Sequence, residues 1–282
     1  MLTRDVIFRK KKNNEKANGD LLERVGDATY NIAAHTRETL CFLGELAKSF
    51  GRLFCGRASF RHIDLWYELD KCGIRAVPIV CLISFMVGLI IAFVGNMQLK
   101  LFGAEIYVAA LVAISMIRIL GAVMTGIIMA GRTGAAYAAE IGTMRVNQEI
   151  DALKTMGIAP MDFLVMPRVL ALTITMPILT ILADIVAILG GMVVAIAIMN
   201  VSVMEYWRTT LEWLSFNNFA VGVLHGWLFG WVIAITGCIC GMRTQKNADG
   251  IGRATTRAVV IGIVGCIVTT AILTLIFNWL DI

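Results

Sequence analysis

The chain has 282 residues, of which 58% are apolar and only 16% are charged, and its formal net charge is +5. Soluble globular domains carry about 45–50% apolar and about 25% charged residues, so this composition argues against a water-soluble enzyme, a disordered chain and a disulfide scaffold. The first 75 residues hold 14 of the 25 Lys and Arg residues. A polar N-terminal segment therefore precedes a membrane-embedded body.

Residues 1–36 are basic and polar, so we expect a disordered cytoplasmic tail there, attracted to anionic lipid headgroups at about 1 kcal/mol per basic residue. No apolar signal core follows the basic start, so no cleavable signal is expected. In the region 37–73, the apolar stretch 40–60 is interrupted by four charged residues. This mixture favours a helix lying in the membrane interface. A cytoplasmic helix packed on the body fits the same pattern.

Five apolar stretches follow in residues 74–282, each long enough to cross a bilayer, whose ~30 Å core needs about 20 helical residues. They cover about 76–99, 106–131, 169–199, 217–242 and 257–280. The sequence therefore predicts an all-α integral membrane protein with five transmembrane helices, preceded by the interfacial helix. The third apolar stretch runs on to Met204, so part of it must tilt, kink at Pro177 or leave the membrane.

Basic residues outside the spans predict the orientation, because Lys and Arg accumulate on the cytoplasmic side. Four basic residues lie between the second and third spans: Arg132, Arg145, Lys154 and Arg168. Four more lie between the fourth and fifth spans: Arg243, Lys246, Arg253 and Arg257. The other side has Lys100 and Arg208. The count predicts a cytoplasmic N-terminus and a C-terminus on the opposite face, as an odd number of spans requires.

Three polar residues inside the spans are candidates for a lipid path. Arg118 lies near the middle of the second span, where a charge costs roughly 2.5–3.5 kcal/mol on insertion scales. It could face a polar cavity or an anionic headgroup, and a structural Arg that satisfies carbonyls between helices is the alternative. Asp184, isolated in the third span, is its obvious counter-charge. His225 in the fourth span is equally consistent with a neutral, packed histidine.

Gly222, Gly226 and Gly230 recur at every fourth residue and share one face of the fourth span. Small residues at this spacing let membrane helices approach closely. The pattern predicts tight helix packing, within a subunit or across a dimer, and it says nothing about the cargo.

Residues 140–157, between the second and third spans, have the pattern of an amphipathic helix. Val146, Ile150 and Leu153 form an apolar stripe from which the charged side chains point away. Gly157 and Pro160 end the helix. The segment is either a surface helix that caps a loop or a docking helix for a soluble partner.

Neither a catalytic site nor a metal site is expected. The seven cysteines and three histidines lack the spacing of known zinc sites, and no Ser/His/Asp arrangement occurs in a soluble domain. The chain contains no Gly-Lys dipeptide and hence no Walker A phosphate loop. We therefore expect no cofactor on this chain and no nucleic-acid partner. Any ATP, with its Mg²⁺, must be bound and hydrolysed by another chain.

The run from Ala130 to Pro160 (AGRTGAAYAAEIGTMRVNQEIDALKTMGIAP), which continues to Pro167-Arg168, resembles the MlaE-like permeases. These are the membrane subunits of ABC-type lipid transporters that work with MCE proteins. Residues 250–257 (GIGRATTR) are a second matching signature, and Gly190-Gly191 is a lesser one. The resemblance extends from about Phe60 to the C-terminus.

The resemblance implies a homodimer of five-span subunits in a bacterial inner membrane, with a cytoplasmic N-terminus and a periplasmic C-terminus. It also implies that residues 136–157 form a coupling helix seated in a cytoplasmic ABC ATPase. A periplasmic MCE-domain protein and a small STAS-type cytoplasmic subunit are further expected partners, and membrane phospholipid or a similar amphiphile is the expected cargo. The candidate coupling residues are Glu140, Met144, Arg145, Glu149, Asp151 and Lys154.

Some positions depart from the family pattern. Many members read Arg-Glu-Leu-Gly-Pro where this chain has Arg118-Ile119-Leu-Gly-Ala122. A Lys of some members falls at His225, and an Asp of their last span falls near Thr270. These departures leave the cargo and the direction of transport open. An ATP-independent transporter or channel and a membrane scaffold for an MCE assembly are the alternative functions.

Overall fold

The computed structural model describes residues 37, 39–52, 62–199 and 201–280, and the chain divides into two units, Met1–Gly51 and Arg52–Ile282. In the first unit, residues 39–51 are helical, within the region for which the sequence predicts an interfacial helix. The tail predicted at 1–36 lies outside the described residues. The membrane body belongs to the second unit, to which the following description is confined.

Five helical runs in the second unit are long and apolar enough to cross a membrane, and no strand occurs among the described residues. The runs are Ile63–Lys100, Glu105–Val146, Met161–Met199, Phe216–Met242 and Ala248–Trp279. They confirm the prediction of an all-α membrane protein with five spanning helices. Several runs are longer than the apolar stretches, because the helices continue into polar sequence.

The first run bends at a glycine. It consists of α3 (His62–Cys72), the 3-10 turn η1 (Ile74–Ala76) and α4 (Val77–Lys100). The amide of Gly73 donates to the carbonyl of Leu69 at 2.8 Å, which closes α3 before the turn. The charged residues of this run lie in α3 and, as Arg75, in η1, whereas α4 carries no charge before Lys100. The bend therefore separates a polar helix from the apolar helix that spans the membrane.

The second run is the longest, with 42 residues. After the turn η2 (Glu105–Tyr107) it consists of α5 (Val108–Ser115), the π-helical segment η3 (Met116–Leu120), α6 (Gly121–Met129), the π-helical segment η4 (Ala130–Gly134) and α7 (Ala135–Val146). A bilayer core needs about 20 helical residues. The second run is therefore much longer than one span needs, and α7 is the part that extends beyond the membrane.

The third apolar stretch is divided between one long helix, which continues through Pro177, and the start of a second helix. The π-helical segment η5 (Met161–Val165) leads into α9 (Met166–Met199), and α10 (Val203–Trp213) begins as a separate helix. The Ser202 hydroxyl caps α10 by accepting a hydrogen bond from the amide of Glu205 at 3.2 Å. The fourth and fifth runs are α11 (Phe216–Met242) and α12 (Ala248–Trp279).

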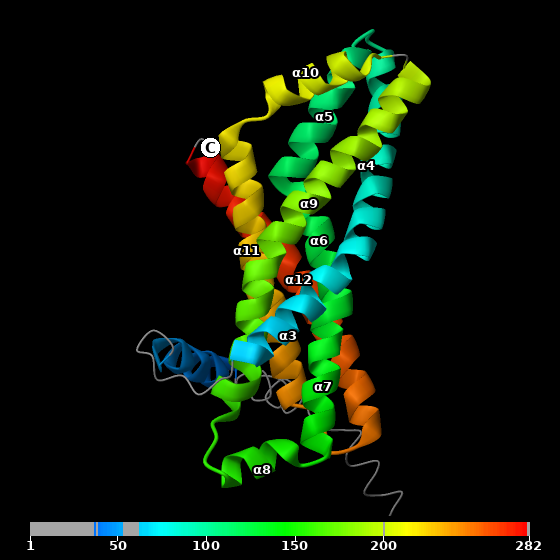
Figure 1. Cartoon of the computed structure of the whole chain (residues 1–282). Helices are drawn as coiled ribbons and strands as arrows, with labels where there is room; N and C mark the ends of the chain where they lie inside the picture. The colour runs from blue at the N-terminus through cyan, green and yellow to red at the C-terminus, as the bar shows by residue number, and fades with distance from the viewer. Residues whose placement is uncertain (1–36, 38, 53–61, 200, 281–282) are drawn as a thin grey trace, which may run out of the picture. The chain divides into compact units, whose positions relative to one another are not determined.

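Two short helices mark opposite ends of the helical bundle. The helix α10 lies across one end, close to α5, and α8 (Glu149–Thr155) lies at the other end, after α7 (Figure 1). These are called the α10 end and the α8 end below. The turn between α11 and α12 belongs to the α8 end, because Lys246 in that turn contacts Asp151 on α8 at 3.3 Å.

The amphipathic helix predicted at about 136–157 is divided in two. The helix α7 ends at Val146, and the amides of Asn147 and Gln148 donate back to the carbonyls of Thr143 and Arg145 at 2.9 and 3.2 Å. Gln148 then takes a left-handed conformation with φ of 62°, which redirects the chain into α8. The predicted apolar stripe therefore does not lie on one helix. Only its middle member, Ile150, is buried.

The helices α4 and α9 approach so closely that glycine is required on both sides. A Cβ at Gly88 would overlap the carbonyl oxygen of Ala187, and one at Gly190 would overlap that of Phe85. Small residues at such crossings are typical of membrane helix pairs, which pack by van der Waals contact. The predicted Gly190 signature thus has a packing role in this chain.

Candidate functional site

Arg118 lies in the π-helical segment η3, inside the second run, and its side chain is half-buried. Its Nη1 donates a hydrogen bond to Oδ1 of Asn218 on α11 at 2.8 Å. π-helical segments inside α-helices frequently occur at functional sites. A cation in the span is therefore held by a neutral amide of a neighbouring span. Asn218 cannot be singled out from the sequence, because an amide near the start of a helix has no distinctive pattern.

Asp184, the expected counter-charge of Arg118, is buried on α9 and lies against Gly121 at the start of α6. No ion pair joins Asp184 to Arg118 in the part of the chain that the structure describes, and Oδ1 of Asp184 is buried there without a hydrogen-bond partner. A Cβ at Gly121 would overlap this oxygen. The absence of a side chain at Gly121 therefore makes room for the carboxyl group.

His225 is fully buried on α11. Its Nδ1 donates to the backbone carbonyl of Val221 at 2.8 Å, and its ring packs near the rings of Phe229 and Phe277, each with a centroid distance of 6.0 Å. Nε2 has no hydrogen-bond partner among the described residues. The surroundings of His225 are those of a packed histidine.

The three glycines of α11 face other helices of the same subunit. A Cβ at Gly222 would overlap the carbonyl oxygen of Ile117 in η3, and one at Gly230 would come within 2.8 Å of the carbonyl oxygen of Leu172 on α9. A Cβ at Gly226 would come within 2.5 Å of Oγ1 of Thr180, also on α9. The face therefore brings α11 against the helices that carry Arg118 and Asp184.

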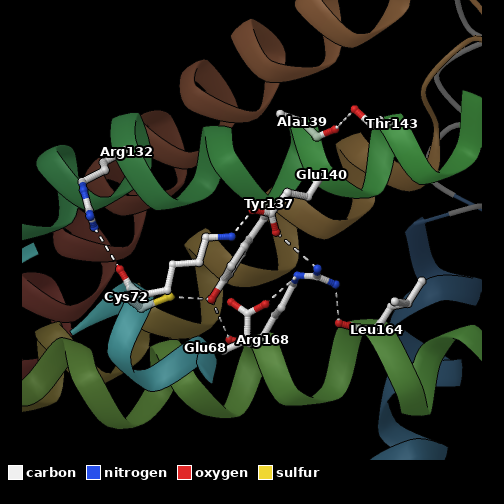
Figure 2. A network of polar contacts seen from close by, with 10 residues as sticks. Glu68, Cys72, Arg132, Tyr137, Ala139, Glu140, Thr143, Leu164 and Arg168 are labelled. Carbon is white, nitrogen blue, oxygen red and sulfur yellow. Dashed lines mark hydrogen bonds and ion pairs between the residues drawn. The ribbon is translucent and has the colours of Figure 1, made fainter. Parts of the chain in front are cut away.

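A second group of polar residues lies toward the α8 end and was not anticipated from the sequence (Figure 2). Its centre is Arg168, near the start of α9. The Arg168 guanidinium lies 3.4 Å from Oε1 of Glu68 on α3 and 3.3 Å from Oε2 of Glu140 on α7, and it donates to the carbonyl of Leu164 at 2.9 Å. One cation thus connects three membrane-spanning runs.

Lys71 adds a second connection between α3 and α7. Its ammonium group forms an ion pair with Glu140, which is therefore shared between Lys71 and Arg168. Nη1 of Arg132, in η4, donates to the backbone carbonyl of Lys71 at 3.2 Å and so satisfies a carbonyl in the last turn of α3. Arg132 holds the end of α3 against the second run.

Tyr137 completes the network from α7. Its hydroxyl lies 2.7 Å from Sγ of Cys72 and 3.4 Å from the backbone carbonyl of Arg168, and the Arg168 guanidinium lies 5.7 Å from the centre of its ring. Tyr137 and Cys72 are fully buried. The name α3–α7–α9 network is used below for Glu68, Lys71, Cys72, Arg132, Tyr137, Glu140 and Arg168.

The six candidate coupling residues divide between this network and the surface around α8. Glu140 belongs to the network, while Met144 and Arg145 are half-buried on the last turn of α7. Glu149, Asp151 and Lys154 are exposed on α8. The coupling candidates therefore lie on two helices, α7 and α8, on either side of the turn at residues 147–148.

A pocket of about 230 Å³ lies between α8 and the turn that follows α11. Its lining residues are Arg145, Ile150, Asp151, Lys154, Met242 and Lys246. Three of them are cations and one is an acid, which pairs with Lys246. The surface beside α8 is therefore concave and positively charged.

These features define a multi-pass α-helical membrane protein with polar residues held between its spans and a short charged helix at one end. Among the described residues no group of His, Cys, Asp and Glu could hold a metal ion. Residues 65–276 match the family described as "Permease MlaE", and the chain belongs to this family.

Relatives with curated names agree with this assignment. The "Probable ABC transporter permease protein" of Rickettsia typhi is 38% identical over 213 residues, which cover 76% of this chain and 79% of that protein. The "Intermembrane phospholipid transport system permease protein MlaE" of Haemophilus influenzae is 29% identical over 239 residues, covering 81% and 90%. The chloroplastic "Protein TRIGALACTOSYLDIACYLGLYCEROL 1" of Arabidopsis thaliana is 29% identical over 226 residues, covering 80% and 64%.

Proposed function

We propose that this chain is the non-catalytic permease subunit of an ABC-type transporter that moves phospholipid or a similar amphiphile, with ATP and Mg²⁺ bound by a separate ATPase subunit. The names of the Rickettsia and Haemophilus relatives support the transporter class and the cargo. The observation that carries the proposal is the position of α8. This exposed, charged helix is joined by a two-residue turn to α7, which continues a membrane-spanning run.

In this proposal the α8 end is cytoplasmic. The eight basic residues counted between the spans belong to η4, α7, α8, the start of α9, and the turn before α12 with its first helical turns. Against these stand Lys100 and Arg208 at the α10 end. The positive-inside rule then gives a cytoplasmic N-terminus and a periplasmic C-terminus in a bacterial inner membrane.

The assembly that we propose is a homodimer with an ATPase subunit at each α8 surface. An MCE-domain protein is the proposed partner at the periplasmic α10 end, and a small STAS-type protein is a further cytoplasmic subunit. Membership of the MlaE permease family supports this set of partners.

Movement of α8 would reach the spans through the α3–α7–α9 network. Glu140 on α7 contacts both Lys71 on α3 and Arg168 on α9, so displacement of α7 must either carry α3 and α9 along or break these ion pairs. The second run is helical without interruption from η3 to α7. A displacement at α8 can therefore reach the level of Arg118.

Arg118 is the proposed contact for the lipid headgroup. A guanidinium can form forked hydrogen bonds to a phosphate, and the amide of Asn218 orients it from α11. Transport requires that the lipid bind the two conformations of the permease with different affinity. A cation between two spans can meet this requirement if the spans move relative to one another.

The test of this proposal is charge reversal on α8. Glu149→Lys combined with Asp151→Lys places two cations beside an already cationic pocket, and mismatched charges at an interface cost several kcal/mol. The variant should insert in the membrane but lose its ATPase subunit during purification from native membranes. The matched control is Glu205→Lys with Glu212→Lys, which makes the same charge change at the α10 end and should retain the ATPase.

Undiminished co-purification of the ATPase with the α8 variant would show that α8 is not the dock. Wild-type protein that carries no ATPase would favour a secondary transporter or channel. Wild-type protein that carries an ATPase but no lipid by mass spectrometry would favour a scaffold. Each outcome contradicts a different part of the proposal.

A further inference from the structure

Two buried residues of α10 face the helical bundle. The Tyr206 hydroxyl donates to the backbone carbonyl of Ile188 on α9 at 3.1 Å, and Thr210, one turn later, is also buried. These contacts determine which side of α10 faces the bundle, and hence where its other sides point.

The remaining surface of α10 divides into an apolar and a polar sector. At 100° per residue, Val203, Trp207 and Leu211 follow each other along one side. Their exposed fractions are 54%, 47% and 54%. Met204 and Leu214, the residue after the end of α10, lie on the same side and are also exposed. When the angle around the helix axis is measured from Tyr206, every side chain between 60° and 160° is therefore apolar.

The polar sector lies on the other side of α10. It consists of Glu205, Arg208, Thr209 and Glu212, which fall at about 200–300° from Tyr206 by the same rotation. The described helix 203–213 thus carries two acids and one base. An amphipathic helix that binds membranes by charge is rich in Lys and Arg, so electrostatic attraction to anionic lipid is not the force available here.

We propose that the apolar sector of α10 inserts into the headgroup–acyl boundary of the lipid leaflet at the α10 end. Its position supports this partner, because α10 connects α9 to α11 and both are membrane-spanning. The short links at each end hold it at the level where the spans leave the membrane. Trp207 in this sector is an aromatic side chain of the kind that is enriched at this level. The inference goes beyond the proposed transport function and does not depend on it.

Insertion has a structural consequence for the spans. The helix α10 joins the ends of α9 and α11, the two helices that carry Asp184 and the partner of Arg118. A helix anchored in the leaflet restricts how far these ends can separate. The lipid surface would then take part in holding the spans around the mid-membrane polar residues.

Tryptophan fluorescence tests this inference in reconstituted full-length protein. One variant keeps Trp207 and has the other five tryptophans replaced by Phe. Its matched control also has Trp207→Phe and carries Glu212→Trp in the polar sector. Both are placed in phosphatidylcholine vesicles with or without bromine on the acyl chains, and acrylamide is added as the aqueous quencher.

We expect brominated lipid to quench Trp207 at least twice as strongly as the Glu212→Trp control, and acrylamide to show the reverse order. Equal access of acrylamide to both positions would overturn the proposal. Protection of Trp207 from both quenchers would also overturn it, because a second copy or a partner protein would then cover the sector.

If the tryptophan variants do not fold, spin labels give the same comparison in a chain with its own tryptophans. Leu211→Cys and Arg208→Cys carry the label in the apolar and polar sectors. The label at residue 211 should be more accessible to oxygen, and the label at residue 208 to a water-soluble nickel chelate. The same accessibility at both positions would contradict insertion. Replacing part of the phosphatidylcholine with an anionic lipid should leave both patterns unchanged, and a large increase in insertion would contradict an apolar mechanism.

Discussion

Replacing Arg168 with methionine should destabilise the protein more than any other single change in the α3–α7–α9 network. Among the described residues, Arg168 is the one cation that contacts both Glu68 and Glu140, and it also satisfies the Leu164 carbonyl. Methionine keeps most of the side-chain volume and removes the charge. The loss of stability then depends on how deeply the acid that is left without its cation is buried.

The magnitude follows from how deeply each pair is buried. The side chains of Arg168 and Glu68 are 10% and 9% exposed, whereas those of Lys71 and Glu140 are 25% and 36% exposed. Removing one partner of a buried pair costs about 3–5 kcal/mol because a charge is left without compensation. The more exposed pair is screened by water, and its loss should cost at most about 1 kcal/mol. The loss of stability caused by Arg168→Met should therefore be several times the loss caused by Lys71→Met.

A double variant separates the unpaired charge from the lost packing. Adding Glu68→Gln to Arg168→Met removes the buried acid, so it should restore most of the lost stability. Thermal unfolding can be followed with a thiol-reactive dye, because Cys72, Cys238 and Cys266 are buried and react only on unfolding. The expected drop in midpoint for Arg168→Met is roughly 10 °C, from about 2–4 °C per kcal/mol. A drop no larger than that of Lys71→Met, or a double variant less stable than the single one, would refute the reasoning.

Three other outcomes are expected. Arg118→Ala should keep its fold and its ATPase but carry less anionic lipid by mass spectrometry, and Arg118→Lys should recover part of the loss because a charge remains; unchanged lipid content with a lower midpoint would leave Arg118 a structural role. Gly226→Ala should cost about 1–3 kcal/mol by overpacking, whereas Gly252→Ala, with no atom within 4 Å of its Cβ position, should be neutral or stabilising in the same melt. Cysteines at Phe102 and Gln245 in a cysteine-free background should react with an impermeant reagent from opposite sides of the membrane, and labelling from one side would contradict five spans.

The five spans could be predicted because lipid imposes one simple requirement on them. A charge-free stretch such as 76–99 has to be helical in a membrane, since every backbone group must be satisfied within the segment. The length of the runs could not be predicted in the same way. Outside the lipid, as in α3 and α7, polar residues continue a helix when tertiary contacts support it. Hydropathy does not reveal these contacts, so it does not predict where such a helix ends.

The polar contacts were beyond prediction for a different reason. Arg118 and Asp184 are the isolated charges of their spans, yet Arg118 bonds Asn218, and Asp184 lies against Gly121. Which residues meet across helices depends on the rotation and depth of each helix, and sequence spacing determines neither. One feature of the sequence points to Arg168, because it is a charge directly before an apolar stretch. That feature predicts only the orientation of the spans and not the contacts of Arg168.

The break at Gln148 changes how force from α8 would be transmitted. A continuous helix from α7 through residue 157 would act as one lever, whereas the turn makes α8 a separate body, linked to α7 by two residues and to the turn after α11 by the Asp151–Lys246 pair. That pair is exposed, so it adds at most about 1 kcal/mol, and α8 can tilt at little cost. Displacement of α7 itself is opposed by the ion pairs of Glu140 with Lys71 on α3 and Arg168 on α9, and by the buried Tyr137. Small movements of α8 should therefore change the conformation of the turn and leave α7 in place. Only a displacement large enough to carry α7, α3 and α9 together would reach the spans around Arg118.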